Sequence, residues 1–138
     1  MKYEGIYKVS KIAKREEDGM VFYDIDKLLA ETADEAEKLT YMKTKANMLM
    51  IDADANIKNL SPIPEGTPVE EIEKAKNQGA QITDDLKYVV TKTTPGKFED
   101  EKLYLHDAST FMTGKEWVEI STDTEDELNL VAMIYKRI

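Results

Sequence analysis

The last stretch of the chain has the most informative pattern of apolar and polar positions. From Leu128 to Ile138, apolar residues occupy both of the faces that alternate along a β-strand. A strand that is apolar on both faces needs other parts of the protein to cover both of them. The pattern therefore predicts one central strand over 128–138, which the rest of the sheet surrounds.

The first stretch of the chain is the predicted partner of this strand. Lys2 to Lys14 alternates, with Tyr7 and Val9 on its apolar face and charged residues mostly on the other. Pairing of the two chain ends would close an antiparallel sheet into a barrel or a near-barrel. We therefore predict a mainly β fold, an antiparallel up-and-down β-barrel with two short helices on its mouth or flank.

Further strands are predicted between the chain ends. The apolar segment 20–25 is either a short strand or a loop that packs on the core. The other predicted strands are bounded by turn residues and cover 47–51, 57–60, 85–93, 97–105 and 117–120. Residues 52–56 form the turn of a hairpin, Thr94–Gly96 joins 85–93 to 97–105, and the acidic segment 121–127 precedes the last strand.

Two helices are predicted. Apolar residues at helical spacing indicate the first over Asp26–Met42, with a candidate break near Thr32. The second covers Val69–Gln78. Thr67 is its predicted N-cap, with Pro68 at the first helical position and a glycine just after its end.

Length and charge limit the function. A chain of 138 residues is most simply one domain, 1–138. The net charge of −9 would repel phosphate backbones and anionic membranes, so we expect no nucleic-acid partner. No apolar run is long enough to span a membrane. With no cysteine and no apolar signal core, we expect a cytoplasmic protein. The oligomeric state is not predicted.

The clearest candidate for cation binding is Asp52-x-Asp54-x-Asn56. It matches the first three ligands of a calcium loop. Such loops then need a glycine and a bidentate glutamate, where this chain has Ile57 and Ile63. An Asp- and Asn-rich hairpin turn explains the pattern better, with cation binding as the alternative. The acidic run at 123–127 is interpreted as a solvated turn. We predict no metal site and no cofactor.

No catalytic pattern is present. His106 is the only histidine, and Asp107 beside it on a strand would point to the opposite face. Tyr135 and Arg137 share a face and would either clamp a carboxylate or, as the favoured interpretation, brace the end of the barrel by packing Arg137 over an aromatic ring. We expect no enzymatic activity.

The methionines and aromatic residues suggest a binding role. Methionine adapts to irregular apolar shapes, and a barrel lined with Met, Tyr and Trp would hold a small apolar or amphiphilic ligand. The predicted ligand-binding residues are Tyr7, Met48, Met50, Tyr88, Tyr104, Trp117 and Met133. The alternative is a packed structural or protein-interaction module without a small-molecule ligand, with an interaction surface at Pro62–Gly66 and the helix after it.

Several motifs resemble a known family. Gly5-x-Tyr7 and Arg137 resemble the Gly-x-Trp motif and terminal arginine of lipocalins, with tyrosine in place of tryptophan. Pro62-Ile-Pro-Glu-Gly66, Trp117–Ile120 and the last stretch are similar to segments of small uncharacterised bacterial lipocalin-like proteins. The resemblance covers nearly the whole chain and implies a calycin-type barrel of about eight to ten strands, with the arginine packed across the aromatic ring. It implies no particular ligand.

Overall fold

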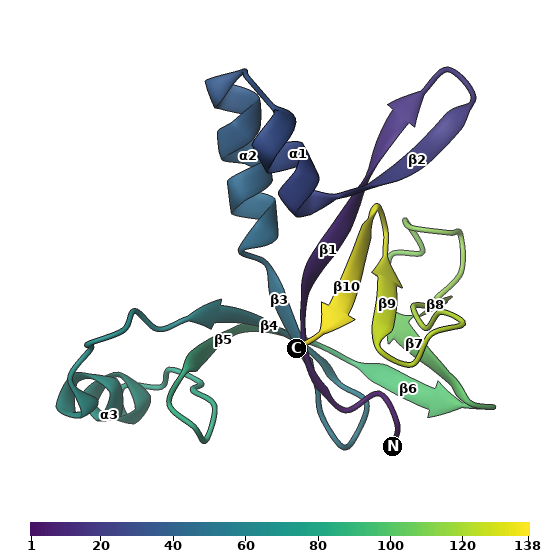
Figure 1. Cartoon of the computed structure of the whole chain (residues 1–138). Helices are drawn as coiled ribbons and strands as arrows, with labels where there is room; N and C mark the ends of the chain where they lie inside the picture. Colours follow the sequence, from purple (N-terminus) through teal and green to yellow (C-terminus); the bar gives the residue numbers. More distant parts are fainter.

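The chain folds into antiparallel sheets with helices at their margins (Figure 1). The computed structural model describes all 138 residues. The strands are β1 (Gly5–Glu16), β2 (Gly19–Asp24), β3 (Met48–Ile51), β4 (Ile57–Pro62), β5 (Tyr88–Thr94), β6 (Gly96–Glu99), β7 (Lys102–His106), β8 (Trp117–Glu119), β9 (Glu127–Leu130) and β10 (Met133–Arg137). The helices are α1 (Ile25–Glu31), α2 (Glu35–Lys45) and α3 (Val69–Asn77). The larger sheet has the order β5-β4-β3-β1-β10-β9, with β2 also paired to β1, and the smaller has the order β6-β7-β8.

The two ends of the chain lie side by side, as the sequence predicts. β1 and β10 pair antiparallel, with Tyr7 opposite Arg137 and Val9 opposite Tyr135. The alternation in the first stretch explains this, because its apolar side chains must lie on the same face as those of its partner. Tyr7, Val9 and Tyr135 are all buried in one core cluster. Pairing of the chain ends is therefore confirmed.

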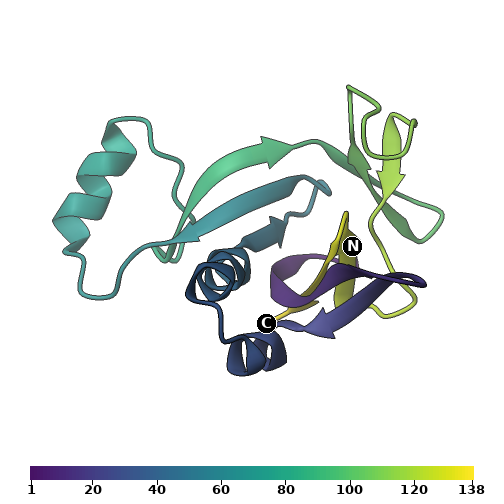
Figure 2. The ribbon, with the colours of Figure 1, turned by 90° about the horizontal axis from the view of Figure 1, so that it is seen from above.

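The predicted closed barrel is wrong, because neither sheet closes on itself. The two sheets meet at one isolated bridge, between Ser121 and Leu128 at the start of β9. At the other side β5 runs through Pro95 into β6, and these two strands do not pair with each other. A barrel needs a continuous ladder at every strand boundary, and here the acidic segment after Ser121 leaves the ladder after a single bridge. Figure 2 shows α3 beyond the outer ends of β4 and β5, away from the other strands.

Two predicted strands are in fact hairpins. The last stretch divides into β9 and β10, because Val131 adopts a φ of 59° and the chain reverses there. The predicted strand 97–105 divides into β6 and β7, where Asp100 and Glu101 both have positive φ. The apolar character of both faces in the last stretch thus reflects two short strands packed side by side rather than one central strand. Thr94–Gly96 joins β5 to β6, but these two strands do not pair with each other, since β5 pairs with β4 and β6 with β7.

Capping residues explain where the helices begin and end. The predicted first helix is two helices, because the chain is extended at Thr32 and Asp34 then caps α2 by accepting a hydrogen bond from the Ala36 N–H. The prediction for α3 is confirmed in extent, but Pro68 occupies the N-cap position and Thr67 makes no capping bond. α3 lies beyond the outer ends of β4 and β5 rather than over a barrel mouth (Figure 1). None of the three helices is both long and apolar enough to cross a bilayer.

Tyr135→Phe is expected to make the protein less sensitive to alkaline pH. The Tyr135 hydroxyl lies in the core against the Met133 Sδ, and burial raises the pKa of Tyr135 from 10.0 to about 12. Because the folded-state pKa is raised, this stabilisation is complete below pH 10 and is lost as the pH rises towards 12. It amounts to about 2–3 kcal/mol of unfolding free energy. Urea unfolding of both proteins at about pH 9 and pH 11.5 measures it. An equal loss of unfolding free energy between the two pH values in both proteins would contradict the prediction.

Candidate functional site

The largest concave surface lies between three segments that are distant in the sequence. The β1–β2 hairpin forms one wall, the turn between β9 and β10 forms the floor, and the loop 107–116 with β8 forms the other wall. The space has a volume of about 660 Å³. We call it the apolar groove, and its lining residues are Ala13, Met20, Phe22, Phe111, Met112, Thr113, Val118, Glu119, Asn129, Val131 and Ala132.

Large apolar side chains are exposed around this groove. Phe111 is 91% exposed, Val131 69% and Met20 57%, and Phe22 and Met112 are also exposed. Each of these side chains would be more stable out of water, by about 1.5–3 kcal/mol when fully buried. Single exposed apolar residues are ordinary, but a contiguous group around a concavity marks a binding surface.

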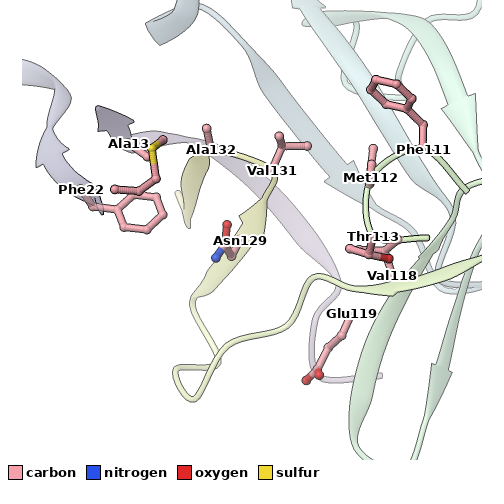
Figure 3. Close-up of a pocket in the computed structure, with 11 residues that line it drawn as sticks. Ala13, Phe22, Phe111, Met112, Thr113, Val118, Glu119, Asn129, Val131 and Ala132 are labelled. Atoms are coloured by element: carbon pink, nitrogen blue, oxygen red, sulfur yellow. The ribbon is translucent and has the colours of Figure 1, made fainter. Parts of the chain in front are cut away.

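One polar atom in the groove has no partner. The side-chain Oδ1 of Asn129 is buried and accepts no hydrogen bond, and it is the one buried side-chain nitrogen or oxygen in the protein in this condition. Asn129 lies between Leu128 and Leu130 on β9, so strand alternation turns its side chain away from the buried side chain of Leu128. Figure 3 shows it at the centre of the groove, between Phe22 on one side and Met112 on the other. A buried acceptor without a donor costs about 1–3 kcal/mol, and a ligand donor would recover this once a small rotation of the Asn129 side chain opened Oδ1 to the groove.

The wall formed by the loop 107–116 is held by Asp107. Its carboxylate accepts hydrogen bonds from the Met112 N–H at 2.9 Å and from the Ser109 hydroxyl at 2.7 Å. These bonds, the one from Met112 first, keep the pKa of Asp107 below its ordinary value. Thr110 adopts a φ of 55°, and its carbonyl accepts from the Gly114 N–H. The loop therefore has a defined turn that presents Phe111 and Met112 on its outside.

The residues predicted to bind a ligand are divided among three places. Tyr7 is fully buried in the core, and Met133 packs against that core. Met48 and Met50 lie on the face of β3 opposite the buried Leu49 and Ile51, and Tyr88 begins β5. Tyr104 and Trp117 are brought together on the outer face of the smaller sheet, where the Lys97 ammonium lies 5.4 Å and 4.5 Å from their ring centroids. None of the seven lines the apolar groove, and ligand binding by them stays a prediction.

His106 belongs to the same outer face as Trp117. The two rings are tilted against each other with centroids 4.7 Å apart, and His106 Nε2 lies 2.7 Å from the Glu116 carboxylate. Asp107 is directed into its own loop, as described above, and does not orient the imidazole. No nucleophile is hydrogen-bonded to His106, so the arrangement fits a surface histidine held by its neighbours.

Asp52 is used by the turn that contains it. Its carboxylate accepts from the backbone N–H groups of Asp54 and Asn56, and Lys58 Nζ lies 3.3 Å away. Burial acts to raise the pKa of Asp52, but these hydrogen bonds together outweigh burial and hold the pKa below its ordinary value. The carboxylate therefore stabilises the β3–β4 hairpin, in which Ala55 adopts the left-handed conformation with a φ of 65°.

Sequence reasoning missed the apolar groove because no motif spans it. Two signals were present: the segment Met20–Phe22, apolar at successive positions, and the pair Phe111–Met112 inside a polar loop. Such residues are unusual in exposed turns. Only the fold shows that they face each other.

Comparison with known proteins gives no match: no family model matches the chain, and no curated protein and no solved structure is significantly similar to it.

Proposed function

We propose that this protein binds a small amphiphilic molecule, and that the apolar groove is the binding site. The observation that carries the proposal is the contiguous group of exposed apolar side chains around this concave surface, with the unpaired Asn129 side chain at its centre. Apolar walls with few placed polar groups are typical of small-molecule sites. The groove supports a ligand with an apolar body and one hydrogen-bond donor, such as a hydroxyl.

The packed core favours the groove over the interior of the sheet as the binding site. Sixteen buried residues form one cluster on the inner face, and Tyr7 belongs to it. A small interior filled by side chains leaves the outer groove as the space where a ligand would fit. A packed core is also what the alternative function, a structural or protein-interaction module, would have. The exposed apolar residues of the groove argue against a purely structural module, which has no use for them.

A relation to the lipocalin-like proteins remains part of the proposal. The contact between the chain ends supports it, because the Arg137 guanidinium carbon lies 5.3 Å from the centroid of the Tyr7 ring, at the end of the paired strands. Gly5 supports it as well, since a Cβ there would lie 3.4 Å from the Arg137 side chain. Position 5 thus lies beside the arginine, and its φ of 143° favours glycine.

Phe22→Ser and Phe111→Ser are expected to weaken the binding of an apolar probe at least about fivefold, because each removes apolar contact area at the groove. The measurement is fluorescence titration with N-phenyl-1-naphthylamine. Val69→Ser is the matched control: Val69 is 57% exposed, on α3, and does not line the groove. Equal binding by all three variants and the wild type would refute the groove as the site.

The role of Asn129 is tested by competition within the same assay. 1-Octanol, which has a donor hydroxyl, is expected to displace the probe about tenfold better than 1-methoxyheptane, which has the same number of heavy atoms and no donor. Asn129→Leu should remove this preference while leaving probe binding intact. Equal competition by the two compounds in the wild type would contradict a hydrogen bond to Asn129.

A further inference from the structure

The outer edge of β2 has free backbone hydrogen-bonding groups. β2 pairs with β1 and with no other strand. The Ala13 N–H donates to the Ala132 carbonyl at 2.8 Å, so the backbone polar groups of Ala13 point away from β2. In an antiparallel pair, the backbone N–H and C=O of the directly opposite residue also point away from the partner strand. The N–H and C=O of Phe22, opposite Ala13, and of Met20, two positions before it, therefore point outward.

This edge carries none of the usual protection against strand addition. Natural edge strands are blocked by lysine, proline, a bulge or a covering element. β2 reads Gly-Met-Val-Phe-Tyr-Asp, with no lysine or proline, and its register with β1 is unbroken from Asp24 to Gly19. Met20, Val21 and Phe22 are all exposed. In Figure 1 the hairpin projects from the sheet with β2 as its outer strand.

We propose that the β2 edge binds an extended peptide of alternating apolar and basic residues, which adds to the sheet as a further strand. Main-chain hydrogen bonds to Met20 and Phe22 would hold the peptide, and alternate side chains give specificity in this binding mode. The side chains of Met20 and Phe22 line the apolar groove, so apolar side chains of the added strand would extend its wall. The inference does not require a small-molecule ligand.

The charges around β2 determine which charge a partner peptide should carry. From Glu16 to Asp26 the chain has five acidic residues and no basic one. Glu17 and Asp18, at the tip of the hairpin, are exposed. The basic residues opposite β2, which are Lys11, Lys14 and Arg15, belong to β1, on the far side of β2 from the free edge. Opposite charges on the peptide would steer its approach and fix its register.

The same charges argue against a second copy of this chain as the partner. Antiparallel pairing of β2 with β2 of another copy would bring the tip carboxylates Glu17 and Asp18 towards Asp24 of that copy. Like charges opposite each other destabilise a strand pair, and each chain carries a net charge of −9.

Amide hydrogen exchange followed by NMR tests the proposal on the whole chain. The probe is the peptide Lys-Val-Lys-Val-Lys-Val-Lys, and Glu-Val-Glu-Val-Glu-Val-Glu is its control. On adding the basic peptide, exchange of the Met20 and Phe22 amides should slow at least about tenfold. The Val21 amide, which faces β1, should be protected before and after. Phe22→Pro, which removes an outward N–H that β1 does not use, should bind the basic peptide at least about tenfold more weakly than Phe22→Ala, which keeps it.

Four outcomes would overturn the proposal. They are absence of binding, binding without protection at Met20 and Phe22, equal binding of the acidic peptide, and equal binding by Phe22→Pro and Phe22→Ala. Concentration-dependent protection of Met20 and Phe22 without peptide would identify a second copy as the partner and also overturn it. Probe binding in the apolar groove is measured separately, so the failure of one proposal is distinguishable from the failure of the other.

Discussion

Gly96→Ala is expected to destabilise the protein by about 3 kcal/mol or more, the largest effect of alanine at any glycine of this chain. Gly96 begins β6, directly after β5, and lies against the turn between β3 and β4. A Cβ there would overlap the Ala55 carbonyl oxygen and lie 2.5 Å from the Ile57 Cδ1 and 2.9 Å from the Tyr104 carbonyl oxygen. Two of these atoms are backbone and cannot rotate away, so the turn or β7 must move.

Urea unfolding measures this cost, and Gly66→Ala is the control. Gly66 has a φ of 83° and no atom within 4 Å of an added Cβ, so alanine there suffers backbone strain without a collision. It should cost about 1 kcal/mol. Gly96 does not have a positive φ, so its cost is steric alone. If Gly96→Ala were no more destabilising than Gly66→Ala, the close approach of β6 to the β3–β4 turn would be wrong.

Arg137→Ala is expected to cost about 2–4 kcal/mol of unfolding free energy. Arg137 Nη2 donates to the Lys2 carbonyl at 2.7 Å, to the Tyr7 hydroxyl at 2.7 Å and to the Glu125 carbonyl at 3.1 Å. The Tyr7 hydroxyl in turn donates to the Tyr3 carbonyl at 2.7 Å. Alanine at position 137 would leave these acceptors without their donor and would release the ends of β1 and β10 from the acidic turn.

Arg137→Lys and Tyr7→Phe separate the parts of this contact. Lysine keeps the charge but lacks the planar guanidinium group, which donates to several acceptors at once. Arg137→Lys should therefore recover less than half of the unfolding free energy that Arg137→Ala loses. In a double-mutant cycle, Arg137→Ala and Tyr7→Phe should show a coupling energy of about 1 kcal/mol or more. Additive effects would mean that the arginine does not act through Tyr7, and the favoured interpretation of Arg137 as a brace would fail.

The sequence was sufficient to pair the chain ends but insufficient to divide the strands. Tyr7 and Val9 alternate cleanly, so the buried face of β1 was predictable. The turns at Asp100–Glu101 and Val131 were not, because these residues adopt positive φ without the glycine or asparagine that usually marks such positions. The reversal at Val131 then made two paired strands resemble one strand with two apolar faces.

The groove was unpredictable for a different reason. Phe22, Phe111 and Asn129 come from three segments that are distant in the sequence, and their meeting depends on the tertiary fold. The sequence assigned the ligand to Met48, Met50 and Trp117 because a closed barrel would have enclosed them. In the structure β3 directs Leu49 and Ile51 into the core, so Met48 and Met50 lie on the opposite face, and Trp117 lies on the outer face with Lys97.

Methyl NMR of the methionines measures ligand location directly. Met20 and Met112 line the apolar groove, whereas Met48 and Met50 lie on β3 outside it. With 13C-methyl methionine and a titration of 1-octanol, the Met20 and Met112 signals should shift together and saturate with one dissociation constant, while Met48 and Met50 stay unchanged. Shifts confined to Met48 and Met50, or no saturable shift at any methionine, would contradict ligand binding in the groove.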